Sequence, residues 1–347
     1  MAATASPSNE IEALVCMAPG ELVVERRPPP ARHEDEALVR PRRIGICGTD
    51  YHIFEGKHPF LEYPRVMGHE LAVEVVEAPP GSGFAPGQIC VVNPYLSCGK
   101  CITCRAGKPN ACTRIAVLGV HRDGGMATLL ALPHTNLVAA EGLSADECAS
   151  VEFLAIGAHA VRRANVGKGD RVLVVGAGPI GLGTALFARL SGGAVSLLDL
   201  DTGRLAATSA MLGVQAIEGG EGAPDAVAQS TQGDGYDVVF DATGSARSME
   251  TSFDFAAPGG RYVLVGVVKD SITFKDPDFH RKELTLLASR NALAADFERV
   301  IAAIRNGDVP TTRIITHRTS LHGAVDDLPR WASSKEGLVK AVVEVEV

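Results

Sequence analysis

Four cysteines are crowded into the segment CGKCITCRAGKPNAC, with the spacing Cys-x2-Cys-x2-Cys-x7-Cys. This spacing suits a tetrahedral Zn²⁺ ion held by the thiolates of Cys98, Cys101, Cys104 and Cys112. Four protein ligands leave no open position for a substrate. The sequence therefore predicts a structural zinc that rigidifies a loop, and any chemistry must take place elsewhere in the chain.

Two other interpretations of this segment fit less well. A pair of disulfides would suit a secreted protein, but the chain is long, its other cysteines are scattered and no signal peptide is visible. Bacterial ferredoxins also begin Cys-x2-Cys-x2-Cys, but their third gap is shorter and a proline follows the last cysteine. This chain has Thr113 at that position, which favours zinc.

A second, reactive metal site is predicted from residues that lie farther apart. Cys47 ends the run RRIGIC, His69 lies in GHE, and Glu152 lies in VEFLA. Singly, such a cysteine is usually a small buried hydrophobe and such a histidine a satisfied core residue. Together, thiolate, imidazole and carboxylate suit Zn²⁺ with a fourth position open for water or substrate, which is the mark of a catalytic site.

A glycine-rich turn predicts dinucleotide binding. The segment GAGPIG matches G-x-G-x-x-G, follows an apolar strand-like run and opens a helix-like segment, which is the context this motif requires. Gly176 permits the tight turn, Gly178 lets the backbone approach the pyrophosphate, and Gly181 allows close packing of helix on strand. Pro179 suits a first helical turn, and Ile180 completes the motif.

The next strand-like run indicates which dinucleotide is bound. Asp199 closes that run, close to the offset of about 20 residues expected of the acid that binds a ribose 2′-hydroxyl. A carboxylate there would repel a 2′-phosphate, so we expect NAD rather than NADP. Arg204 lies one helical turn further on and either faces solvent or contacts the adenine edge. Val267, in RYVLVGV, is also assigned to the cofactor site.

The elements that must position these residues fall into two domains, because 347 residues exceed what one core usually supports. Up to about residue 155, short strand-like runs alternate with turns such as APPGSGFAPGQ, which predicts an antiparallel β-rich domain. Beyond it, apolar runs alternate with helix-like segments, which predicts an α/β doubly wound parallel sheet. The C-terminal run LVKAVVEVEV is expected to return to the first domain.

Composition narrows the class of protein. The 46% hydrophobic and 21% charged residues are typical of a globular protein. A net charge of −8 offers no basic surface for nucleic acid or an anionic membrane. No apolar run approaches the ~18 residues of a membrane span. We therefore expect a cytoplasmic protein with a small-molecule substrate and no nucleic-acid or membrane partner.

In this order, the segments CGTDYH, GHE, the four-cysteine lobe and GAGPIG resemble the zinc-dependent medium-chain dehydrogenase/reductase family of alcohol, sorbitol and threonine dehydrogenases. The resemblance covers nearly the whole chain. It implies a GroES-like catalytic domain from residues 1–155 and 290–347 and a Rossmann NAD-binding domain from residues 156–289. It also implies an active site in the cleft between them, two zinc ions per chain, and a homodimer or homotetramer.

The same resemblance implies roles for single residues. The triad predicted above, Cys47, His69 and Glu152, stands at the catalytic zinc-ligand positions. Glu70 occupies the place of a carboxylate that binds zinc directly or through water. Thr49 and His52 match the hydroxyl and imidazole of the family's proton relay, which would take the proton of the substrate hydroxyl as its carbinol hydride passes to NAD.

The substrate is less clearly encoded. Phe54, His58 and Phe60 lie between the two zinc-ligand segments, so we expect them to line the site. Arg290 and Asn291 follow the last predicted strand of the parallel sheet, where such sheets meet their ligands. A cation and an amide there would suit a carboxylate or several hydroxyls, unless Arg290 pairs with an acid at an interface. These segments look most like the branch that oxidises hexonates at a secondary alcohol.

Other functions stay open at this stage. Within the family, the substrate could instead be another alcohol, polyol, aldose or amino alcohol. A reductase of the same fold without catalytic zinc, acting on quinones or enones, is disfavoured because all three predicted zinc ligands are present. A non-catalytic NAD- and zinc-binding protein is disfavoured because the relay residues Thr49 and His52 are intact.

Overall fold

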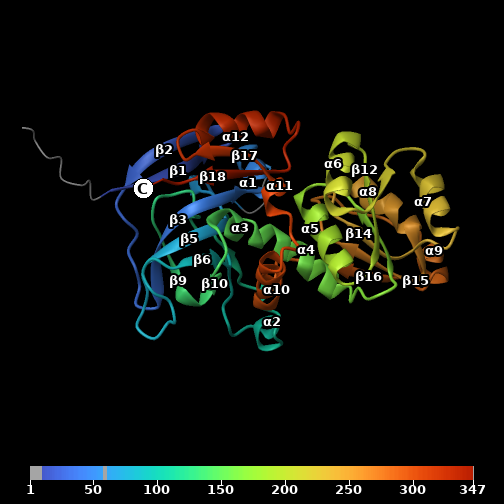
Figure 1. Ribbon diagram of the computed structural model, residues 1–347, viewed down its shortest axis with the longest axis horizontal. Helices are drawn as coiled ribbons and strands as arrows, with labels where there is room; N and C mark the ends of the chain where they lie inside the picture. The colour runs from blue at the N-terminus through green and yellow to red at the C-terminus, as the bar shows by residue number, and fades with distance from the viewer. Residues whose placement is uncertain (1–9, 58–60, 347) are drawn as a thin grey trace, which may run out of the picture. The chain divides into compact units, whose positions relative to one another are not determined.

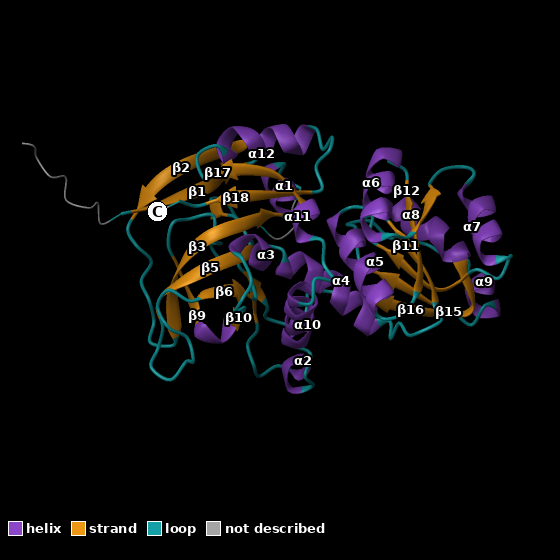
Figure 2. Ribbon diagram, viewed as in Figure 1, coloured by secondary structure: helices purple, strands orange, loops and turns teal. Residues whose placement is uncertain are grey.

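The computed structural model describes residues 10–57 and 61–346. The predicted substrate-site residues His58 and Phe60 therefore lie outside the described residues. The contacts within the chain define two compact units, Met1–Glu152 with Ile301–Val347, and Phe153–Val300. The first unit is rich in strands, and the second alternates strands with helices (Figures 1 and 2).

A mixed, mostly antiparallel sheet is the centre of the first unit. Its order is β10 (Leu137–Ala139), β6 (Ile89–Val92), β5 (Glu70–Glu77), β3 (Glu36–Ile46), β18 (Lys340–Glu344) and β17 (Ile315–Ser320), with β9 (Leu130–Pro133) also paired to β3. Strand β18 pairs antiparallel with β3 and parallel with β17. The C-terminal tail therefore joins the sheet that the N-terminal segments build (Figure 1).

Smaller elements complete this unit. A second sheet has the order β2 (Glu21–Arg27), β1 (Ile11–Ala18) and β4 (Arg65–Val66), and β7 (Tyr95–Leu96) pairs with β8 (Ala116–Val117). The helices are α1 (Gly48–Phe54), α2 (Ile102–Arg105), α3 (Ala145–Ala149), α11 (Thr311–Ile314) and α12 (Ala324–Ser333). Most of them are short, so tertiary packing and not helix propensity has to hold them.

The second unit is a parallel sheet with helices between its strands. The strand order is β13 (Gln215–Glu218), β12 (Ala194–Asp199), β11 (Arg171–Val175), β14 (Tyr236–Asp241), β15 (Ala256–Leu264) and β16 (Thr285–Ala288). The connecting helices are α5 (Pro179–Leu190), α6 (Thr202–Leu212), α7 (Ala223–Thr231), α8 (Ala246–Ser252) and α9 (Asp276–Arg281). This is the doubly wound arrangement, which confirms the predicted α/β fold class.

Burial explains why the strands of the second unit read as continuous apolar runs. Four of the five residues of β11 are buried, as are five of the six residues of β12. A parallel strand that is covered by helices on both faces has no side facing water, so polar residues do not alternate along it.

Two helices pass from one unit to the other along the chain. These are α4 (Val151–Arg163), whose first two residues belong to the first unit, and α10 (Ala294–Arg305), whose last residues return to it. Among the described residues, we find no helix with the length and apolar character that crossing a membrane requires.

Candidate active site

Three of the predicted reactive residues converge in the first unit. The ligand atoms of Cys47, His69 and Glu70 all lie within 4.8 Å of one another. Cys47 is the N-cap of α1, and Glu70 begins β5, directly after His69. Two segments that lie apart in the sequence thus bring a thiol, an imidazole and a carboxylate to one place.

Asp50 holds these two segments together. Its buried carboxylate accepts the backbone N–H of Cys47 at 2.9 Å and that of Gly68 at 3.3 Å. Gly68 has a φ of +91°, and a Cβ there would approach Ile44 and Met126 to 2.9 Å. A side chain at residue 68 would therefore both strain the backbone and push His69 out of place. These two hydrogen bonds give Asp50 a structural role between the segments of Cys47 and His69.

Glu70 is fixed by an ion pair that the sequence did not reveal. Nζ of Lys340, at the start of β18, donates to Oε1 of Glu70 at 2.6 Å, and Lys340 is only 2% exposed. Gly45 lies opposite, where any Cβ would collide with the Glu70 carboxylate. The one signal in the sequence was a lysine inside the otherwise apolar run LVKAVV.

Glu152 lies in the first turn of α4 and is buried, but it is not one of the three mutually close donors. Its Oε1 accepts a hydrogen bond from the hydroxyl of Tyr95, another partner that the sequence did not predict. Burial raises the pKa of Glu152 to about 7. The carboxylate also acts on His69, because its charge is among the causes that raise the pKa of that imidazole.

The electrostatics of this cluster fit a divalent cation. Burial alone would lower the pKa of His69, but the charge and hydrogen bond of Cys47 and the charges of Asp50 and Glu152 raise it well above its ordinary value. Nδ1 of His69 is buried and has no hydrogen-bond partner among the residues that the structure describes. Sulfur, nitrogen and carboxylate donors around one point form the ligand set that zinc prefers.

The predicted relay residues lie on the helix that begins at this cluster. Oγ1 of Thr49 lies 3.8 Å from Sγ of Cys47. His52 follows three residues later in α1 and is exposed to solvent. Residues three apart share a face of a helix, so α1 aligns a hydroxyl near the cluster with an imidazole that reaches water. Phe54, the last residue of α1, is half-buried.

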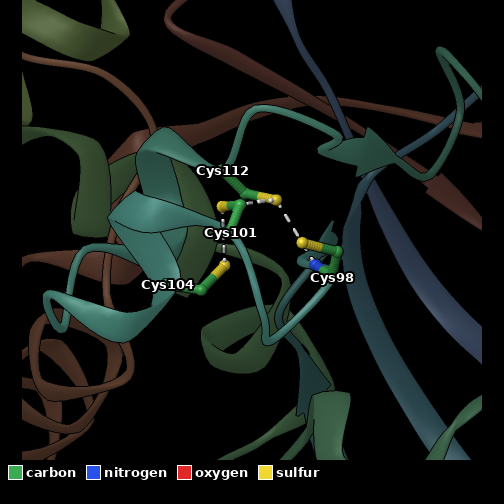
Figure 3. A group of neighbouring side chains, drawn as sticks. All are labelled: Cys98, Cys101, Cys104 and Cys112. Carbon is green, nitrogen blue, oxygen red and sulfur yellow. Dashed lines mark hydrogen bonds between the residues drawn. The ribbon is translucent and has the colours of Figure 1, made fainter.

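The four-cysteine segment forms a separate cluster. The ligand atoms of these cysteines all lie within 4.8 Å of one another, and their sulfurs point toward a common centre (Figure 3). Sγ of Cys101 lies 3.4 Å from that of Cys104 and 3.8 Å from that of Cys112. The Thr103 hydroxyl is the largest cause that lowers the pKa of Cys101, to about 4. The thiolate form, which binds metal, is therefore favoured at Cys101, whereas desolvation raises the pKa of Cys104 to about 11.

The predicted dinucleotide turn follows β11 and opens α5. Gly176 has a φ of +101°, which suits glycine, and Gly178 is the N-cap of α5 with Pro179 at its first position. A Cβ at Gly181 would collide with the carbonyl oxygen of Gly176. Ile180 lies in the first turn of the same helix. The amide donors of a helix N-terminus thus meet a backbone that a phosphate can approach closely.

Asp199 ends β12 beside this turn. Its Oδ2 accepts the backbone N–H of Ala177 at 2.6 Å, and Arg204 grips the carboxylate with Nε at 3.2 Å and Nη2 at 2.8 Å. Burial alone would raise the pKa of Asp199, but the hydrogen bonds from Arg204 and Ala177 lower it below its usual value. Arg204 is thus paired with the Asp199 carboxylate and is not merely a solvated side chain.

The remaining predicted residues follow the last two parallel strands. Val267 is 88% exposed in the segment after β15. Arg290 and Asn291 follow β16, where Arg290 is exposed and Asn291 adopts a φ of +53°. All three lie at the carboxyl edge of the parallel sheet, the edge that also carries Gly176 and Asp199.

The second unit is a doubly wound sheet with a dinucleotide turn, and the first unit carries a four-cysteine lobe and a cluster of mixed metal donors. Together these features define the class of zinc-dependent, NAD-linked dehydrogenases. Comparison with known proteins agrees. Residues 33–142 match the alcohol dehydrogenase GroES-like domain, and residues 179–306 match the zinc-binding dehydrogenase domain.

Individual relatives point the same way. The chain is 37% identical to L-galactonate-5-dehydrogenase of Escherichia coli K12, with 96% of this chain and 99% of the relative aligned. It is 30% identical to a sorbitol dehydrogenase of Halalkalibacterium halodurans, over 87% of this chain and 90% of that relative. An alcohol dehydrogenase from E. coli CFT073, solved in complex with NADH, is 27% identical with a TM-score of 0.91, covering 97% of this chain and 100% of that chain.

The chain therefore belongs to the zinc-dependent medium-chain dehydrogenase family, in which a hexonate branch is represented. It is a zinc- and NAD-dependent oxidoreductase of the alcohol and polyol class, built from a GroES-like and a Rossmann-type domain.

Proposed function

We propose that this protein oxidises a secondary alcohol of a sugar acid to a ketone with NAD⁺, as a hexonate 5-dehydrogenase. The observation that carries the proposal is the 37% identity to L-galactonate-5-dehydrogenase over almost the full length of both chains. Polyols are the second candidate substrates, because a sorbitol dehydrogenase is 30% identical. A guanidinium and an amide, those of Arg290 and Asn291, stand at the sheet edge and would suit a carboxylate with neighbouring hydroxyls.

In this proposal, each metal site has its own ligands. Cys98, Cys101, Cys104 and Cys112 hold the structural zinc. Cys47, His69 and Glu152 hold the catalytic zinc, and Glu70 either joins them or binds through water. The mutual proximity of Cys47, His69 and Glu70 supports a metal at this place, as does Nδ1 of His69, which has no partner among the described residues. Glu152 is not one of the mutually close donors, and only its charge, which acts on His69, supports its part in the site.

The reaction also needs a path for one proton. Bound zinc supplies Lewis acidity toward a hydroxyl, and NAD⁺ accepts the hydride. As Oγ1 of Thr49 accepts the proton of the substrate hydroxyl, the Thr49 hydroxyl passes its own proton toward His52, one helical turn later, which releases it to solvent. Asp50 keeps Cys47 at the N-cap of α1, so the helix that carries the relay starts at the metal cluster.

We further propose that residues 1–155 and 290–347 form the catalytic domain and that residues 156–289 form the NAD-binding domain. The two compact units described above support this division, although their boundaries differ slightly from the proposed ones and fall inside α4 and α10. A cytoplasmic location fits an enzyme whose thiolates must stay reduced, and the family resemblance implies a homodimer or homotetramer.

A panel of hexonates, polyols, aldoses, threonine and simple alcohols, each with NAD⁺, tests the proposal. We expect the highest kcat/KM on a hexonate such as L-galactonate, with a polyol second. Exclusive activity on short unbranched alcohols would refute the polyhydroxy substrate. The variant Arg290→Met, assayed on a hexonate and on a neutral polyol as a matched pair of substrates, tests the role of the guanidinium. It should raise KM for the hexonate and leave KM for the polyol within about twofold, because only the hexonate carries a carboxylate.

A further inference from the structure

The order of the parallel strands indicates where each half of the dinucleotide lies. The pyrophosphate belongs at the turn after β11, and Asp199, on the adenosine side, ends β12. Strands β14, β15 and β16 lie on the other side of β11. The nicotinamide half must therefore lie over the segments that follow these three strands.

The segment of residues 289–293, which follows β16, has no regular structure of its own. The backbone N–H of Ser289 donates to the carbonyl of Leu264 at 2.9 Å, which continues the pairing of β16 with β15 by one residue. Asn291 then adopts a φ of +53°, in the left-handed region, which few residues other than glycine adopt and which asparagine tolerates better than most. A short link with a left-handed residue keeps one conformation only when its surroundings hold it.

Asp296, in the first turn of α10, fixes the end of this segment by hydrogen bonds. Its carboxylate accepts the backbone N–H of Leu293 at 2.9 Å, and its own N–H donates to the Leu293 carbonyl at 2.9 Å. The far end of the segment is thus tied to the helix by two reciprocal hydrogen bonds. The side chain of Asp296 is 0% exposed, so this anchor is shielded from water.

Two side chains of α4 hold Asp296 in turn. Arg162 donates to Oδ1 through Nε at 2.7 Å and to Oδ2 through Nη2 at 3.0 Å. Nδ1 of the buried His159 lies 2.8 Å from Oδ2. Burial alone would raise the pKa of Asp296, but these hydrogen bonds lower it to about 2, so the carboxylate stays charged at any working pH.

Within the segment itself, one polar atom has no partner. Oγ of Ser289 is buried and makes no hydrogen bond to any residue that the structure describes. A buried hydroxyl without a partner costs about 1–3 kcal/mol unless a ligand or water satisfies it. It sits at the carboxyl end of β16, on the side of the sheet assigned above to the nicotinamide half.

We propose that His159, Arg162 and Asp296 form a positioning cluster that holds residues 289–293 in the conformation that receives the nicotinamide half of the cofactor. The inference rests on the proposed function only in requiring that the cofactor is a nicotinamide dinucleotide. The identity of the substrate does not enter. None of the three residues need touch the cofactor, because they act through the segment.

Binding of cofactor fragments tests the proposal without turnover. Dissociation constants for NADH and for ADP-ribose, which lacks the nicotinamide, are measured on the zinc-loaded protein and on Asp296→Asn and Arg162→Met. In Asp296→Asn, the asparagine can still accept the Leu293 N–H but has lost the charge that pairs with Arg162. Arg162→Met removes the same ion pair by changing Arg162, whose side chain is half-exposed. We expect NADH to bind about tenfold more weakly to both variants, with ADP-ribose changed by less than about twofold.

Arg299→Met is the matched control. Arg299 also lies on α10, but it donates to Ser191 in the segment after α5 and not to the start of its own helix. This variant should leave both dissociation constants unchanged, and Arg162→Lys should restore part of the NADH affinity. If the cluster were purely structural, Asp296→Asn and Arg162→Met would lower the melting temperature but leave the ratio of the NADH and ADP-ribose dissociation constants as in the wild type. That result would overturn the proposal. Failure of the substrate panel with this ratio shifted would overturn only the proposed substrate.

Discussion

The pair Thr49 and His52 shows how much chemistry depends on the start of one short helix. Both lie on α1, whose N-cap is the candidate zinc ligand Cys47, and their spacing of three places them on one face. Only His52 is exposed. The two residues should therefore contribute unequally to proton transfer, because solvent can replace the outer one but not the inner one.

We expect Thr49→Val to lower kcat by about 100-fold or more, since a positioned acid–base group contributes at least that much. His52→Ala should lower kcat by a smaller factor, and added imidazole should restore part of it. Steady-state kinetics on the best substrate of the panel measures both. Equal losses in the two variants, or a fully active Thr49→Val, would contradict the relay.

Asp199 should determine the choice of cofactor. Its carboxylate, which the hydrogen bonds of Arg204 and Ala177 keep ionised, would repel a 2′-phosphate. We expect the wild type to prefer NAD⁺, and Asp199→Ser to shift the ratio of kcat/KM toward NADP⁺ by at least about tenfold, because it removes the repulsion and frees Arg204. A wild-type enzyme that used NADP⁺ equally well would remove this role from Asp199.

At the scale of elements, local patterns were predictable and distant partners were not. The cysteine spacing and the glycine turn are read within a few residues of sequence, and both appear as expected clusters or turns. The Glu70–Lys340 pair joins residues 270 apart, and the His159–Asp296 pair joins residues 137 apart. No periodicity or spacing links such residues, because the sheet and the helices that bring them together form only in the folded chain.

The four-cysteine lobe has little structure of its own beyond α2 and one 3-10 turn, Pro109–Ala111. Its shape should therefore depend on the metal, as in other small zinc lobes. We expect Cys101→Ser to lose one zinc per chain and to become sensitive to proteolysis within residues 98–112. Metal analysis and limited digestion test this. Cys16→Ala, at a buried cysteine outside both clusters, should keep both zinc ions and resist digestion.

The first turn of α10 should give the fold a distinct dependence on pH. The pKa of Asp296 is about 2 in the fold, below the value of about 3.9 in an unfolded chain. A depressed pKa stabilises the fold above the unfolded value, and that stability is lost as the pH falls through the folded value. The difference in free energy of unfolding between wild type and Asp296→Asn should narrow by about 1 kcal/mol from pH 6 to pH 3. Urea unfolding at the two pH values measures it, and a constant difference would contradict this assignment.

For the molecule as a whole, the fold class and the family were accessible from sequence, while the surroundings of the metal cluster were not. The order of the four motifs was enough to indicate the family, because each lies at a strand end or helix start that the fold reuses. The hydrogen bond of Tyr95 to Glu152 and the burial of Lys340 beside Glu70 needed the structure. Both partners come from strands whose pairing the sequence alone did not specify.

The whole molecule is thus expected to work as two separable functions on one chain, metal-assisted proton removal in the first unit and dinucleotide binding in the second. This separation leads to one expectation for every variant that removes a ligand of the metal cluster. Losing a zinc ligand should abolish turnover and leave cofactor binding intact.

The most direct measurement compares wild type with Cys47→Ala for zinc content, NADH affinity and turnover of L-galactonate with NAD⁺. We predict two zinc ions per chain in the wild type and one in the variant, NADH affinity within about twofold, and turnover reduced by at least about 1,000-fold. A Cys47→Ala protein that has lost this zinc and still turns over the substrate at a rate near that of the wild type would contradict the account.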